Sequence, residues 1–366
     1  MGRFARRGAQ KKRCMVKNQL NQPGIDGARR RLQMADIARL AGVSTATVSR
    51  ALNHSPLVNE ATRTRILELA QSLKYSINVG AQNLRLKQNR TVSVMFPFER
   101  DTRQPLSDPF LLAMLGSLAD ALTEQGFDML FSRIGSDELG AAAASFDSGR
   151  AIGIILVGQL RHHEQINELA ARQVPIVVWG AQLPNQLYCC VGSDNVRGGE
   201  LATSHLLALG RRRIAFFGDL ALPEPLQRYR GYCAALARHA IDVDPRLQVS
   251  VSFLPDGGVQ GVQEMARRAE PFDAVFACSD LVARTAIDTL RTHGMRVPDD
   301  VAVIGYDDIA QAALFHPRLT TVHQPIAAAA ETMVAALLSL IDGGAVRSVA
   351  LPTILSIRAS AGELLT

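Results

Sequence analysis

Eight short apolar runs occur between residues 91 and 308, each separated from the next by a segment of ten or more residues with helical character. In chain order they read TVSVMF, FDMLFS, AIGIILVG, VPIVVWG, RIAFFGD, QVSVSFL, FDAVFACSD and VAVIGYDD. Strands that alternate with helices build parallel βαβ units. Because there are too many strands for one modest sheet, residues 91–366 are expected to form two doubly wound α/β subdomains. A ligand cleft is expected at the carboxyl ends of the strands.

Residues 34–77 have a different, all-helical pattern. Residues 34–41 and 45–52 predict two short helices around a Gly turn, with Ser44 as N-cap, and Asn59 caps a third helix. This arrangement is a helix-turn-helix. The side chains expected to face its core are Ile37, Leu40, Ala41, Val48, Leu52, Ile66, Leu69, Ala70 and Leu73.

The second helix, TATVSRAL, carries short side chains and one Arg on its outward side. In a helix-turn-helix this helix enters the major groove, where short side chains approach base edges and Arg reaches guanine. Thr45, Ala46 and Arg50 are therefore expected to read bases. Phosphate contacts are expected from Thr47, Ser49, Asn53 and Thr62, with Arg63 as an additional candidate.

Positive charge is concentrated at the amino-terminal end of the chain. Residues 1–33 hold ten Lys and Arg against one acid, and residues 34–90 carry a net charge of +5, whereas the remainder carries −8. This asymmetry favours a polyanionic partner for the amino-terminal part only. Residues 1–33 are interpreted as a basic disordered arm; the alternative is that translation starts at Met15 or Met34.

Several classes of protein are disfavoured by what the sequence lacks. No apolar run is long enough to cross a membrane and no export signal is recognisable, so a soluble, cytoplasmic protein is expected. The five cysteines show no metal-ligand spacing, and Cys189 and Cys190 are interpreted as small buried residues; neither a metal nor a cofactor is expected. Phosphate-binding, nucleophile-elbow and metalloprotease motifs are missing, which disfavours an enzyme.

Two long segments resemble the LacI/GalR family of bacterial transcription regulators: MADIARLAGVSTATVSRALNHSPLVNEATRTRILELAQSLKYSIN and VPDDVAVIGYDDIAQAALFHPRLTTVHQP. The resemblance extends from residue 34 to about residue 360. It implies a small all-α headpiece followed by two periplasmic-binding-protein-like subdomains. It also implies a homodimer that binds double-stranded operator DNA and whose DNA affinity is controlled by a small-molecule effector.

The same resemblance implies that Asn78 to Leu84, within the hinge and linker segment 78–90, form a hinge helix that orders on DNA. Asn78, Ala81 and Leu84 match the family pattern, and Leu84 would be the apolar wedge in the minor groove. Three positions depart from that pattern, which favours fewer backbone contacts and a looser hinge: Ile77, Gln82 and Asn83.

For the effector, the family match implies Arg228 and Asp280 as polar anchors. Further candidates are Asp108, Phe110, Gln159, Trp179 and Asp307. Carboxylates accept hydrogen bonds from the vicinal hydroxyls of a sugar, and the guanidinium of Arg donates paired hydrogen bonds to ring or hydroxyl oxygens. A sugar is therefore the expected effector. A purine or nucleoside corepressor is the alternative, and a sugar-binding or sugar-processing protein is a third reading.

Overall fold

The computed structural model describes residues 34–52, 55–73, 89–99 and 104–362 of the protein. The chain divides into two compact units, one ending at Gln82 and the other beginning at Asn83, and each is described by itself. The predictions for the arm 1–33, for Asn53 and for the hinge residues Asn78, Ala81 and Leu84 lie outside the described residues.

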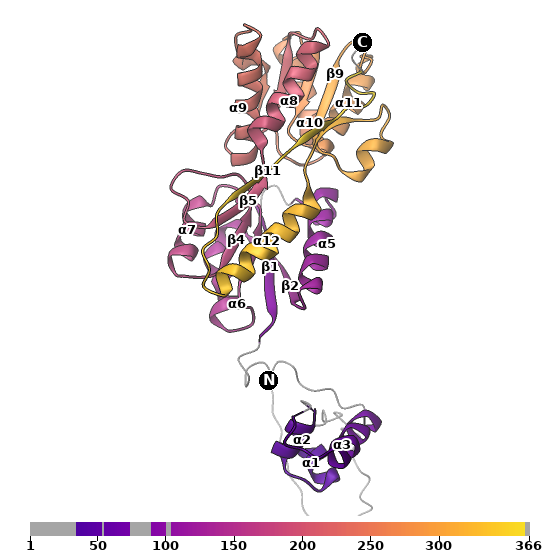
Figure 1. Ribbon diagram of the computed structural model, residues 1–366. Helices are drawn as coiled ribbons and strands as arrows, with labels where there is room; N and C mark the ends of the chain where they lie inside the picture. The colour runs from indigo at the N-terminus through magenta and orange to yellow at the C-terminus, as the bar shows by residue number, and fades with distance from the viewer. Residues whose placement is uncertain (1–33, 53–54, 74–88, 100–103, 363–366) are drawn as a thin grey trace, which may run out of the picture. The chain divides into compact units, whose positions relative to one another are not determined.

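The first unit contains three helices, α1 (Met34–Ala41), α2 (Thr45–Leu52) and α3 (Glu60–Ser72) (Figure 1). Its core is built from Ile37, Ala38, Ala41, Val48, Ala51, Val58 and Ile66, with Leu52, Leu69 and Leu73 packed against it. The expected helix-turn-helix core is therefore confirmed, with one correction. Leu40 is 58% exposed, because the inward face of α1 runs through Ala38 instead.

Side-chain caps and two arginines stabilise the turns of this headpiece. The Ser44 hydroxyl accepts a hydrogen bond from the backbone N–H of Thr47 at 3.1 Å. Asn59 caps α3 in the same way, and the Arg65 guanidinium donates to the Ala41 carbonyl at the end of α1. Arg63, a predicted phosphate contact, is instead directed inward. Its guanidinium donates to the carbonyls of Ser55 and Val58, leaving the side chain 17% exposed.

The second unit contains two six-stranded sheets. The first sheet has the order β11-β5-β4-β3-β1-β2, with all pairings parallel. Its strands are β1 (Thr91–Phe98), β2 (Asp128–Gly135), β3 (Ile154–Val157), β4 (Ile176–Trp179), β5 (Cys189–Ser193) and β11 (Val349–Leu351).

The second sheet has the order β12-β10-β9-β8-β6-β7, and only β12 runs antiparallel to its neighbour. Its strands are β6 (Ile214–Phe217), β7 (Gln248–Val249), β8 (Ala274–Ala277), β9 (Ala302–Asp307), β10 (Thr320–His323) and β12 (Ile354–Ser356). All eight predicted strands are present, and the two doubly wound subdomains are confirmed.

Helices cover both faces of each sheet, which explains why the strands are apolar on both sides. In the first lobe, one face packs against α5 (Pro109–Glu124) and α12 (Ile326–Ile341). The other face packs against η1 (Ser136–Ala143), α6 (Ala144–Asp147) and α7 (His163–Ala171). Cys190 is fully buried on that second face and Cys189 is buried on the first, as expected.

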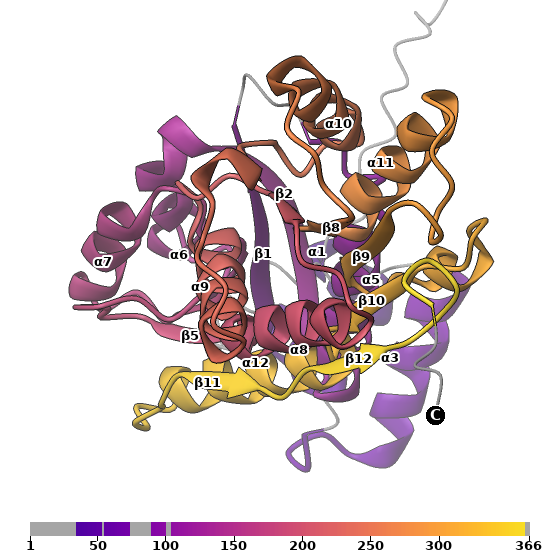
Figure 2. The same cartoon turned by 90° about the horizontal axis from the view of Figure 1, so that it is seen from above.

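In the second lobe, α10 (Asp256–Arg268) and α11 (Asp280–Thr292) cover one face of the sheet, and α8 (Asn195–Ala208) and α9 (Pro223–Arg238) cover the other. Short 3-10 turns, η2 (Pro245–Leu247) and η3 (Ala310–Leu314), join the strands. Helices α8 and α9 lie side by side (Figures 1 and 2). A Cβ added at Gly199 of α8 would overlap the Arg228 carbonyl of α9, so this close approach requires glycine.

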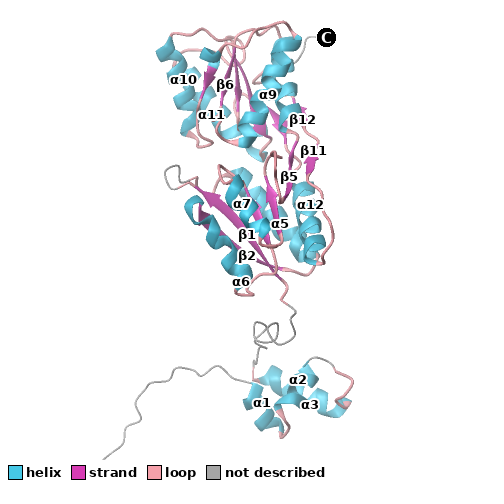
Figure 3. Cartoon of the chain, turned by 90° about the vertical axis from the view of Figure 1, so that its left-hand side faces the viewer, coloured by secondary structure: helices cyan, strands magenta, loops and turns pink. Residues whose placement is uncertain are grey.

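The chain passes between the lobes three times, and each lobe is therefore built from separate parts of the sequence. The crossings run from β5 to α8, from β10 to α12 and from β11 to β12 (Figure 3). Because three segments connect the lobes, relative motion of the lobes is expected to be a bend about these connections. The carboxyl ends of both sheets face each other across the space between the lobes.

Candidate functional site

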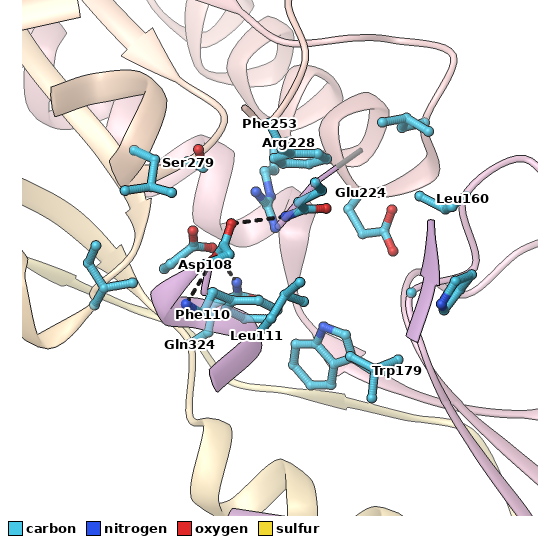
Figure 4. A pocket seen from close by; sticks show the side chains of 18 residues that line it. Asp108, Phe110, Leu111, Leu160, Trp179, Glu224, Arg228, Phe253, Ser279 and Gln324 are labelled. Carbon is cyan, nitrogen blue, oxygen red and sulfur yellow. Dashed lines mark hydrogen bonds between the residues drawn. The ribbon is translucent and has the colours of Figure 1, made fainter. Parts of the chain in front are cut away.

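A cavity lies between the two lobes, at the carboxyl ends of β1, β3, β4, β6, β8 and β9 (Figure 4). It encloses about 840 Å³ of space, counted out to its open mouth. Five of the seven predicted effector residues line this cavity: Asp108, Phe110, Trp179, Arg228 and Asp307.

Arg228, on α9, is held rigidly at the polar end of the cavity. Its side chain is buried, Nε donates to Oδ1 of Asn195 at 2.8 Å, and Nη1 donates to the carbonyl of Cys278. The guanidinium also stacks on the ring of Tyr306, with 3.6 Å between Cζ and the ring centroid. Because these contacts use only part of its five N–H groups, the remaining donors are available to a ligand.

Asp307 also lines the cavity, at the end of β9, where the backbone takes an unusual path. Its φ is +124° and that of Asp308 is +57°, conformations that side-chain-bearing residues rarely adopt and that concentrate at functional sites. Nε2 of Gln324 donates to Oδ1 of Asp307 at 2.7 Å. Burial raises the pKa of Asp307 to about 7. The positive charge of Arg228 and the hydrogen bond from Gln324 oppose this rise, whereas the negative charge of Asp108 adds to it.

Asp280, predicted as an anchor, does not line this cavity. It is fully buried below the strained turn, where Oδ2 accepts from the backbone N–H of Ile309 at 2.9 Å and Oδ1 accepts from the Thr321 hydroxyl. Burial raises its pKa well above the ordinary value, and Asp307 contributes to the rise. Its observed contacts fix the segment that presents Asp307, and the preceding residue, Ser279, faces the cavity instead.

The first lobe contributes an acid and two aromatic rings. Asp108 caps α5, with Oδ1 accepting from the Phe110 N–H at 2.9 Å and Oδ2 accepting from Nε2 of Gln104 at 2.9 Å. The rings of Phe110 and Trp179 lie with centroids 6.2 Å apart, tilted by 42°. Figure 4 shows Asp108, Arg228 and Trp179 arranged around the same space. Apolar ring faces beside fixed carboxylates suit the faces and hydroxyls of a sugar.

Gln159 also lies outside the lining, although its neighbours Gly158 and Leu160 belong to it. Its side chain is fully buried in the first lobe. The amide oxygen accepts from the backbone N–H of Ala181 at 2.5 Å, and the amide nitrogen donates to the Tyr188 hydroxyl at 3.1 Å. Both of these side-chain hydrogen bonds are to residues of the first lobe.

Four polar lining residues were not predicted: Gln104, Glu224, Ser279 and Gln324. Glu224 lies in the first turn of α9, and burial raises its pKa, against the effects of a backbone N–H and of Arg228. The prolines at 223 and 225 mark a helix start a few residues after strand β6, and this signal could have identified Glu224. Gln324 follows β10, a strand that was not predicted.

In the headpiece, the predicted base-reading residues Thr45, Ala46 and Arg50 are exposed, and Thr47, Ser49 and Thr62 are half-buried. Val48 and Ala51 face the core from the same helix. The outward side of α2 thus carries short side chains and one Arg, a surface that fits the major groove of DNA.

Comparison with known proteins agrees with both halves of this description. Residues 33–78 match the family model of bacterial regulatory proteins of the lacI family, and residues 203–361 match a periplasmic binding protein-like domain. The chain is 34% identical over 323 residues to the transcriptional regulator CelR of Thermobifida fusca, covering 86% of this chain and 93% of that protein. The chain belongs to the LacI family.

Other LacI-family proteins show the same relationship. The probable repressor ExuR of Bacillus subtilis is 32% identical over 84% of this chain and 91% of its own length. A CelR–cellobiose complex superimposes with a TM-score of 0.68, at 32% identity over 90% of this chain and all of that one. For the lac repressor dimer bound to operator, the TM-score is 0.81, at 25% identity over 91% of this chain and 99% of that one.

As a member of the LacI family, the protein is a DNA-binding transcriptional regulator and not an enzyme. Within the described ranges, no helix is both long and apolar enough to cross a membrane. The same ranges contain no group of His, Cys, Asp and Glu that could hold a metal ion.

Proposed function

We propose that the protein is a repressor whose affinity for operator DNA is controlled by a sugar bound in the interlobe cavity. The observation that carries this proposal is the lining itself: Arg228 and Asp307 from one lobe face Asp108, Phe110 and Trp179 from the other. A ligand that contacts both lobes stabilises one angle between them over another, and so shifts the equilibrium between two states of the regulator.

The chemistry of the cavity favours a sugar over a flat base. Phe110 and Trp179 are tilted by 42° and do not form a parallel slot for a purine. Carboxylates and a partly satisfied Arg offer acceptors and donors in the pattern that vicinal hydroxyls require. The similarity to a CelR–cellobiose complex supports this assignment. A purine corepressor is the alternative, since the repressor PurR of Haemophilus influenzae is 27% identical over 79% of this chain's length.

On the DNA side, Thr45, Ala46 and Arg50 are proposed to read base edges and Thr47, Ser49 and Thr62 to contact phosphates. The protein is proposed to act as a homodimer on a near-palindromic site, which the similarity to the operator-bound lac repressor dimer supports. Binding to chromosomal DNA leads us to expect a cytoplasmic protein. Asn53 and the hinge residues Asn78, Ala81 and Leu84 remain predicted DNA contacts.

The single Trp makes a direct experiment available, because Trp179 lines the cavity. The full-length protein is titrated with sugars, and with hypoxanthine and guanine, while Trp fluorescence is recorded. An operator selected from random duplexes is then used in mobility-shift assays with each ligand. We expect a sugar to change the fluorescence and release the DNA. Release by no sugar, or tighter binding with a purine, would contradict the proposal.

A further inference from the structure

The interlobe cavity continues outward into a second chamber. The outer chamber has about 460 Å³ of space, counted to its mouth, and shares with the cavity the residues Pro97, Gln104, Leu160, Leu222 and Phe253. Its other lining residues are Phe98, Glu99, Asp219, Ser252 and Leu254. Both lobes therefore contribute to both chambers, and the two chambers are direct neighbours.

The outer chamber repeats the chemistry of the inner one. The rings of Phe98 and Phe253 supply apolar surface, and Asp219 and Ser252 supply polar groups. The hydroxyl oxygen of Ser252 accepts from the Leu254 N–H at 3.3 Å, so its proton can be donated to a ligand.

Asp219 is held in place from both lobes. Oδ1 accepts from the backbone N–H of Ala221 at 3.0 Å, and Oδ2 pairs with the Arg161 guanidinium of the first lobe at 2.5 Å. The Ser250 hydroxyl also donates to Oδ1 at 3.4 Å. A carboxylate has about four acceptor sites, so these three contacts leave about one open for a ligand hydroxyl. The ion pair fixes the direction in which this site points.

The charge of the lining restricts the ligand further. Among the described residues, five acidic side chains line the two chambers, against one basic side chain, Arg228. The acids are Asp108, Glu224 and Asp307 in the inner chamber and Glu99 and Asp219 in the outer one. Asp219 is already paired with Arg161, and burial raises the pKa values of Glu224 and Asp307. Carboxyl oxygens accept hydrogen bonds from neutral hydroxyls, whereas Arg228, which already donates to Asn195 and Cys278, is the one described basic lining side chain that could pair with an anionic group on the ligand.

We propose that the outer chamber is a second sugar subsite and that the effector is an uncharged disaccharide. One ring occupies the inner chamber beside Trp179, and the other lies in the outer chamber with its hydroxyls on Asp219 and Ser252. This inference rests on the proposed sugar response and specifies its ligand class.

Isothermal titration calorimetry on the full-length protein tests it with three sets of probes. The sets are glucose, galactose and their methyl glycosides; cellobiose, maltose and lactose; and glucose 6-phosphate and galacturonate. We expect at least one disaccharide to bind about tenfold or more tightly than its own monosaccharides, as one additional hydrogen bond to a charged group provides. The charged sugars are expected to bind more weakly than their neutral counterparts.

Two substitutions locate the second ring. Asp219→Asn keeps the size of the side chain, and Ser252→Leu fills the outer chamber; each is expected to weaken disaccharide binding about tenfold and to leave monosaccharide binding unchanged. Asp242→Asn, at an exposed acid remote from the lining, is the matched control.

The outcomes separate this inference from the proposed function. Monosaccharides that bind as tightly as disaccharides, or substitutions that weaken both equally, overturn the second subsite and leave the sugar response intact. Tighter binding of a charged sugar overturns the requirement for a neutral ligand. Failure of every probe in all three sets to bind refutes the sugar response itself.

Discussion

Replacing Asp307 by Asn is expected to stabilise the ligand-free protein, and increasingly so as the pH rises. The side chain keeps its shape and still accepts the hydrogen bond from Gln324. The variant loses the negatively charged carboxylate. Burial raises the pKa of this carboxylate from the ordinary value of 3.8 to about 7, and Arg228 and Gln324 only partly oppose the rise. Ionising this group in the folded protein is therefore costly.

The direction in which stability changes with pH depends on how many protons the folded and unfolded states bind. Between pH 4 and pH 7 the folded state keeps a proton on Asp307 that the unfolded chain has released, so parent stability falls as pH rises through this window. A rise in pKa from 3.8 to about 7 corresponds to a cost on the order of 4 kcal/mol at pH 8, and less than half of that cost is already present at pH 5. The advantage of the variant should thus grow by a few kcal/mol between these two pH values.

Urea unfolding of parent and variant, followed by far-ultraviolet circular dichroism at pH 5 and pH 8, measures this difference. Asp242→Asn, at an exposed position, serves as the control and should show no such growth. Equal differences between Asp307→Asn and parent at the two pH values would refute the raised pKa. A loss of stability at pH 8 would show that the carboxylate is a net stabilising group.

Three other substitutions test the headpiece and the packing of the second lobe. Arg50→Ala should cost about 1–3 kcal/mol at one operator position while nonspecific DNA binding stays nearly unchanged; equal loss on all sequences in mobility-shift assays would exclude base reading. Asn59→Ala removes the cap of α3 and should lower headpiece stability by about 1 kcal/mol, measured by thermal unfolding of residues 34–77 beside the parent fragment. Gly199→Ala should lower the melting temperature of the whole protein, because its Cβ would overlap the Arg228 carbonyl; an unchanged melting temperature would show that α8 and α9 can separate freely.

The sequence predicted the strands that are buried on both faces, because such strands are continuous apolar runs. It missed β5, whose residues CCVGS are small, and β10, where Thr320 and Thr321 are buried hydroxyl residues. The three-residue strands β11 and β12 are too short to produce a periodic signal. The three connections between the lobes begin or end at these four strands. Such connections depend on the tertiary structure and leave no local pattern in the sequence.

Two of the predicted effector residues lie one position away from a side chain that lines the cavity. Ser279 lines it and Asp280 does not, since Ser279 is the N-cap of α11 with extended backbone and Asp280 is the first helical residue, so the two side chains point in different directions. Similarly, Gly158 and Leu160 line it while Gln159 points back into the first lobe. Sequence patterns identify the end of a strand, but the direction of a side chain there depends on the local backbone, as the positive φ of Asp307 illustrates.

The three crossings also fix the order in which a newly made chain can fold. The headpiece core is complete once residue 73 has left the ribosome. The sheet of the first lobe, in contrast, lacks its final strand until Val349–Leu351 has been synthesised, and the sheet of the second lobe awaits Ile354–Ser356. The nascent protein thus acquires its DNA-reading module early, whereas its ability to sense a metabolite arises only after both of these late strands have been made.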